Sequence, residues 1–64
     1  MKRRDLLHYL SQHNCRFVRE GGEHSIWENP ITNHRTSVPR HRKIPDFTVA
    51  RICKQLSIPK PIVM

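Results

Sequence analysis

The most informative part of the sequence is residues 15–28, which read CRFVREGGEHSIWE. Residues 15–19 are rich in side chains that favour extended backbone and predict a β-strand. Gly21 and Gly22 supply a tight reversal, because glycine adopts backbone conformations that other residues avoid. Residues 24–28 then predict a second strand. The segment is therefore expected to form a β-hairpin.

A helical pattern precedes this hairpin. Residues 3–13 place Leu6, Leu7 and Leu10 at helical spacing, which predicts a helix with one apolar face. Asn14 tolerates the left-handed conformation that often ends a helix. We expect the helix to stop there and the first strand to follow directly.

The chain after the hairpin predicts one more strand and one more helix. Residues 35–38 form a weaker third strand that Pro39 ends. Residues 40–45 are a basic loop, and Asp46 is the expected N-cap of a helix over residues 47–57. The apolar stripe of this helix consists of Val49, Ile52, Cys53 and Leu56, with Phe47 and Ala50 beside it.

The predicted order is α-β-β-β-α. Three antiparallel strands joined by short turns form a meander, and both helices cover one of its faces to make two packed layers. The fold class is therefore α+β. Residues 1–64 are expected to form a single domain, in which residues 59–64 are a short C-terminal tail containing two prolines.

Composition narrows the classes of function. The 64 residues contain 12 Lys and Arg against 5 Asp and Glu, a formal net charge of +7. This excess favours an anionic partner, most commonly nucleic acid. The length excludes a multidomain cofactor enzyme, and no apolar run reaches the roughly 18 residues of a membrane helix. We expect neither a membrane partner nor a secretory signal, because Asp5 and His8 interrupt the N-terminal segment.

Cysteine usage indicates the compartment. Cys15 and Cys53 are isolated, without the paired spacing of a zinc site and without an export signal. They are predicted to be reduced core thiols in a cytoplasmic protein, and no metal or other cofactor is expected. Trp27, the only tryptophan, is predicted to anchor the core, although it could instead stack on a base.

His24 is the candidate for chemistry. It follows the glycine pair at the start of a strand, where the lack of side-chain bulk would let a phosphodiester backbone approach. Histidine transfers protons near neutral pH, and RNA carries its own nucleophile in the 2′-hydroxyl. If this chain is an enzyme, metal-independent RNA cleavage demands the fewest protein groups. His41 is a candidate acid, and a purely structural His24 is the alternative.

The basic loop is the candidate phosphate-binding segment. It presents Arg40, His41, Arg42 and Lys43 just before a predicted helix N-terminus, where free N–H groups attract anions. Arg19 lies next to the hairpin turn and is assigned to the same RNA-binding set, as are both glycines. A loop that is merely solvated is the alternative.

Four segments of the sequence resemble the HicA (YcfA-like) toxin family. They are residues 2–7 (KRRDLL), 17–27 (FVREGGEHSIW), 38–41 (VPRH) and 52–56 (ICKQL). The resemblance implies a fold similar to a double-stranded RNA-binding domain. It also implies an mRNA interferase of a type II toxin–antitoxin pair. The histidine after the paired glycines is catalytic in that family, which maps to His24. The implied partners are mRNA and a HicB-like antitoxin that masks the active site.

Two other functions remain open from the sequence. A non-catalytic RNA-binding module of the same fold would bind RNA by its shape and phosphates without cutting it. A protein-interaction subunit would use its charge only to bind an acidic partner. Neither function requires a histidine beside a glycine turn.

Overall fold

The predicted hairpin forms the first two strands of a three-stranded sheet in the computed structural model, which describes residues 1–62. Strands β1 (Arg16–Gly21), β2 (His24–Asn29) and β3 (His34–Pro39) are antiparallel and lie in the order β1-β2-β3. The register pairs Gly21 with His24 and His24 with Pro39. The start of β2 therefore lies between the ends of its two neighbours.

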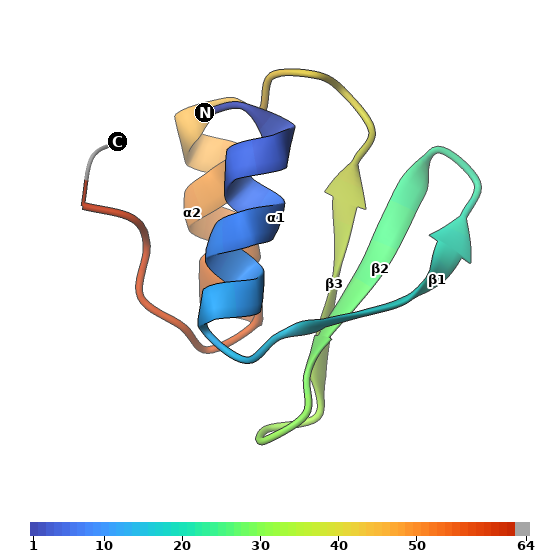
Figure 1. Cartoon of the computed structure of the whole chain (residues 1–64), viewed down its shortest axis with the longest axis vertical. Helices are drawn as coiled ribbons and strands as arrows, with labels where there is room; N and C mark the ends of the chain where they lie inside the picture. Colours follow the sequence, from blue (N-terminus) through green and yellow to red (C-terminus); the bar gives the residue numbers. More distant parts are fainter. Residues whose placement is uncertain (63–64) are drawn as a thin grey trace.

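Helices α1 (Arg3–Gln12) and α2 (Asp46–Gln55) lie side by side on one face of this sheet (Figure 1). The predicted α-β-β-β-α order and its two-layer α+β architecture are confirmed. Within residues 1–62, neither ten-residue helix combines the length and the apolar character that a membrane crossing requires.

The core fills the space between the helices and the sheet. Most of the predicted core side chains are buried: Leu6, Leu10, Cys15, Trp27, Val49, Ile52, Cys53 and Leu56. The core also contains Val38 and Ile44, which had not been predicted. Leu7 is only partly buried at the edge of this cluster. Phe47 is 79% exposed, so the expectation that it lies beside the core stripe is wrong. It lies in the first turn of α2 on the side opposite Val49, which is fully buried, so its side chain faces solvent.

The two faces of β2 differ as strand alternation predicts. Ser25 and Trp27 are buried against the helices, whereas His24 is exposed and Ile26 only partly covered. Glu28 is the exception: it is 5% exposed, although it alternates with the residues of the open face. Arg16 of β1 and Arg35 of β3 cover it and donate hydrogen bonds to its carboxylate.

The predicted end of α1 is confirmed, whereas the predicted cap of α2 is not. Asn14 has a φ of 66°, as the predicted left-handed end of α1 requires. The prediction that Asp46 caps α2 is wrong. Pro45 is the N-cap, and its carbonyl accepts hydrogen bonds at 3.0 Å from the N–H groups of Thr48 and Val49. The helix begins one residue early because the extended backbone of Pro45 already directs its carbonyl into the first turn.

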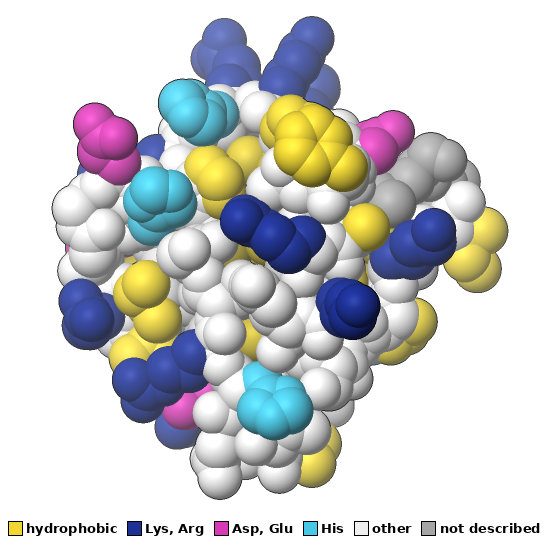
Figure 2. Space-filling model, turned by 180° about the vertical axis from the view of Figure 1, so that it is seen from behind, with side chains coloured by type: hydrophobic (Ala, Val, Ile, Leu, Met, Phe, Trp, Pro, Cys, Tyr) yellow, Lys and Arg dark blue, Asp and Glu magenta, His cyan; other side chains and the backbone are white. Residues whose placement is uncertain are grey.

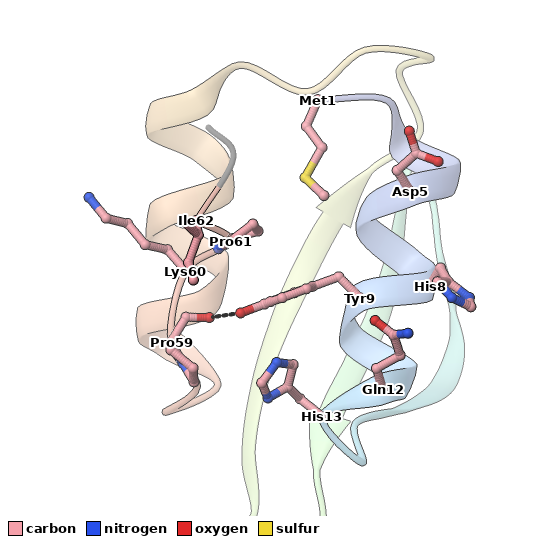
Figure 3. A pocket seen from close by; sticks show the side chains of 10 residues that line it. All are labelled: Met1, Asp5, His8, Tyr9, Gln12, His13, Pro59, Lys60, Pro61 and Ile62. Carbon is pink, nitrogen blue, oxygen red and sulfur yellow. Dashed lines mark hydrogen bonds between the residues drawn. The ribbon is translucent and has the colours of Figure 1, made fainter.

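The C-terminal tail folds back over the helices. The N–H of Ile58 donates to the carbonyl of Cys53 at 3.0 Å, and the Tyr9 hydroxyl donates to the carbonyl of Pro59 at 2.5 Å. Figure 3 shows the resulting hollow of about 470 Å³ between α1 and the tail. Pro59 of the predicted tail is therefore attached to α1, Ile62 is 99% exposed, and the last two residues of the tail lie outside the described part of the chain.

The N-terminal segment pairs with the basic loop. An isolated antiparallel bridge joins Lys2 to Lys43. The N–H of Arg3 donates to the carbonyl of Arg42 at 2.9 Å, and that of Ile44 donates to the carbonyl of Met1 at 2.8 Å. Two basic segments that are far apart in the sequence are thus held side by side by main-chain hydrogen bonds.

Candidate active site

The β1–β2 connection consists of Gly22 and Glu23, with Gly21 and His24 paired on either side of it. Gly22 has a φ of 65°, a conformation that strongly favours glycine, as expected for the first position of a two-residue hairpin. A Cβ built on Gly22 meets nothing within 4 Å. The requirement for glycine is therefore conformational, and the surface in front of the turn is open.

His24 is exposed at the first position of β2 and lines a shallow hollow of about 270 Å³. The same hollow is lined by Gly22, Glu23, Arg40 and His41. The two histidines, 17 positions apart in sequence, reach one hollow because the register places His24 opposite Pro39. The loop after β3 then continues past the hairpin turn.

A chain of polar contacts supports this hollow from the helix side. Arg40 forms an ion pair with Glu20, and the hydroxyl of Ser25 donates to the same carboxylate at 2.9 Å. The guanidinium of Arg3 donates to the Ser25 hydroxyl at 2.7 Å and to the carbonyl of Pro39 at 3.0 Å. Ser25 is 1% exposed, so these contacts connect the start of α1 to the base of the hollow through the interior.

The cations of the predicted RNA-binding set differ in how they are paired. Arg40 is partly neutralised by Glu20. In the described residues, Arg19, Arg42 and Lys43 have no carboxylate within 4.0 Å. Their charges are the ones available to an external anion.

The predicted RNA-binding residues do not all line one hollow. Arg40 and His41 lie with His24, whereas Arg42 lines a second hollow with Lys2, Arg3 and Arg4. Sequence analysis missed the contribution of Arg3. Its only signal in sequence was the basic cluster at residues 2–4, which gave no indication of a contact with Ser25.

Other candidate groups are excluded by their burial. Trp27 is 8% exposed and meets Phe17 edge-on at a centroid distance of 6.2 Å, so its rings serve the core and cannot stack on a base. Burial raises the pKa of both thiols, Cys15 and Cys53, and so keeps them protonated and unreactive. Among residues 1–62, no three His, Cys, Asp or Glu side chains gather as a metal-binding group would require.

The surface as a whole is cationic. Figure 2 shows Lys and Arg side chains spread across one side of the molecule, with histidines and few acidic side chains among them. Fold and surface together define a small α+β protein that presents histidine and arginine side chains at its surface.

Comparison with known proteins identifies the family. The family model described as "HicA toxin of bacterial toxin-antitoxin" matches residues 3–58. The chain belongs to the HicA toxin family and is a toxin of a toxin–antitoxin system. No curated protein and no solved structure matches the chain.

Proposed function

We propose that this toxin is a metal-independent endoribonuclease that cuts mRNA in the cytoplasm and thereby inhibits translation. The observation that supports this proposal best is the presence of two exposed histidines and an arginine in one open hollow. The family match supports it independently, because the HicA toxins are generally ribonucleases.

The chemistry requires a base, an acid and a cation. His24 removes the proton from the ribose 2′-hydroxyl, whose oxygen attacks the adjacent phosphorus. The bond from phosphorus to the 5′-oxygen breaks, and His41 gives that oxygen a proton. The products are a 2′,3′-cyclic phosphate and a 5′-hydroxyl. Arg40 stabilises the extra negative charge of the pentavalent transition state.

The open turn and the neighbouring cations hold the substrate. Gly22 leaves room for the phosphodiester backbone beside His24, and a Cβ on Gly21 would come within 3.4 Å of the Arg19 guanidinium. Arg19, Arg42 and Lys43 add positive charge around the hollow. RNA binding is therefore expected to weaken steeply as the salt concentration rises.

The toxin–antitoxin assignment implies a protein partner. We propose a HicB-like antitoxin whose acidic groups cover His24 and the loop over residues 40–43. The net charge of +7 on the toxin would speed its association with such a partner.

Digestion of RNA in the presence of EDTA tests the proposal. The wild-type protein should release fragments that end in a 2′,3′-cyclic phosphate. His24→Ala should release none while its RNA affinity stays within about threefold, because the imidazole acts on the reaction more than on binding. Undiminished cleavage by His24→Ala would reject this histidine as the base.

One observation favours a second candidate, the non-catalytic RNA-binding module. Glu20 already pairs with Arg40, which reduces the charge this arginine offers to a transition state. If the wild-type protein binds RNA tightly but leaves it intact after long incubation, this second function is the correct one.

A further inference from the structure

The start of α1 and the loop before α2 enclose a second hollow, of about 420 Å³, that differs from the one at His24. Of the described residues, only four cationic ones line it: Lys2, Arg3, Arg4 and Arg42. Like charges repel one another, so such a group is stable only where the fold holds it in place or an anion neutralises it.

Main-chain pairing holds these cations together. The bridge between Lys2 and Lys43 and the bond from the N–H of Arg3 to the carbonyl of Arg42 fix the two segments relative to each other. These contacts use backbone atoms only, so the side chains of Lys2, Arg4 and Arg42 remain available. The hollow is thus positioned before any ligand arrives.

The charges in this hollow are poorly compensated. Among residues 1–62, Asp5 is the only carboxylate within 4.0 Å of these four cations; it lies 3.9 Å from Arg4, and both side chains are well exposed, so this pair contributes little. No side chain in the described chain caps the N-terminus of α1. The positive end of the helix adds to the field of the four side chains, although its first N–H, that of Arg3, is already bonded to the carbonyl of Arg42.

We infer that this hollow binds successive backbone phosphates of the substrate RNA, as a second site beside the catalytic one; the inference rests on the proposed function. Arginine forks and helix N–H groups suit a phosphate with several oxygen acceptors. Arg3 connects the two hollows, since its guanidinium donates to the carbonyl of Pro39, the residue paired with His24. One strand of RNA would therefore contact both hollows, with no base recognised in the second.

The test measures RNA affinity in the non-cleaving His24→Ala protein. The variant carries Lys2→Gln and Arg4→Gln, and the probe is a fluorescently labelled single-stranded RNA. Losing two phosphate contacts should raise Kd about tenfold near physiological salt. It should also reduce the slope of log Kd against log salt by about 1.4, roughly 0.7 for each contact.

A matched control removes the same charge from the other end of the molecule. Arg51→Gln with Lys54→Gln neutralises two exposed cations in the second half of α2. Its RNA affinity should change by less than about twofold, with the slope nearly unchanged. Arg42→Gln is an independent variant, because the backbone carbonyl of residue 42 can still accept the hydrogen bond from the N–H of Arg3. The slope of log Kd against log salt should fall by about 0.7 in this variant.

Three results would overturn the inference. One is a Lys2→Gln and Arg4→Gln protein that binds RNA no more weakly than the control. Another is an unchanged salt slope in that variant and in Arg42→Gln. The third is unaltered RNA binding together with weaker binding of poly-glutamate, which would assign the hollow to an acidic protein. Since the assay measures binding alone, a wild-type protein that fails to cut RNA would reject the proposed function and leave this result standing.

Discussion

The two hollows lie next to each other but differ in composition. The hollow at His24 contains histidines and an arginine, with Glu20 and Glu23 close by. The hollow at the start of α1 contains cations only. A mixed environment suits proton transfer, whereas unpaired cations suit the binding of phosphate. Under the proposed function, this small domain would separate the reaction from the positioning of its substrate.

The largest expected effect concerns the rate of RNA cleavage, and it tests whether the hollow at His24 holds the proton donor. His41→Ala should slow cleavage at least about a hundredfold, because the leaving 5′-oxygen loses its proton donor. A substrate with sulfur in place of that oxygen should restore the rate, since a thiolate leaves without a proton. The same substrate should not restore His24→Ala. Cleavage by His41→Ala at the wild-type rate would contradict its role as the acid.

A smaller effect concerns the contact that joins the two hollows. Arg3→Ala removes the bonds to Ser25 and to the carbonyl of Pro39, and should lower the free energy of unfolding by about 1–3 kcal/mol. Urea titration measures this free energy. Arg4→Ala is the control and should change the free energy of unfolding by less than about 0.5 kcal/mol, because the Arg4 side chain is exposed. Equal effects of the two substitutions would show that Arg3 is only another surface cation.

The smallest expected effect concerns Glu28 on the open face of the sheet. This residue lines neither hollow, so it serves as a reference for both. Arg35 and Arg16 approach the carboxylate of Glu28 at 2.9 and 2.8 Å, and their hydrogen bonds lower the pKa of Glu28. A lowered pKa in the folded state stabilises the protein above the unfolded pKa of about 4.3. That stabilisation is lost as the pH falls through the folded value.

Urea unfolding between about pH 6 and pH 2 therefore separates the wild type from Glu28→Gln. The wild type should be the more stable of the two above about pH 5, and the difference should shrink on acidification. RNA cleavage by Glu28→Gln near neutral pH should match the wild type. A stability difference that does not vary with pH would show that the Arg35 and Arg16 contacts do not depend on the charge of Glu28.

The order of the elements was predictable, and the composition of the hollows was not. Leucines at helical spacing and the glycines before His24 are local signals, and local signals determine which segments become helix or strand. The reversal itself falls one residue later than predicted, at Gly22 and Glu23, because Gly21 pairs with His24 as the last residue of β1. The meeting of His24 and His41 depends on the register between β2 and β3, which neither segment encodes alone.

Two differences from prediction have different causes. Phe47 is exposed because, at about 100° per residue, it lies roughly 160° around the helix from Val49, opposite the buried stripe. Ile44 was assigned to a basic loop but is 1% exposed, and its backbone pairs with Met1. Helical periodicity applied strictly would have predicted the first outcome, whereas the second depends on a contact between distant segments.

The central claim is that the imidazole of His24 performs the proton transfer. The most direct test is the single-turnover rate of RNA cleavage with protein in excess and EDTA present, which isolates chemistry from binding. The single-turnover rate of His24→Ala should be at least about a hundredfold below that of the wild type. His8→Ala, which replaces an exposed histidine on α1, should keep the wild-type rate. Equal rates for the two variants would contradict the central claim.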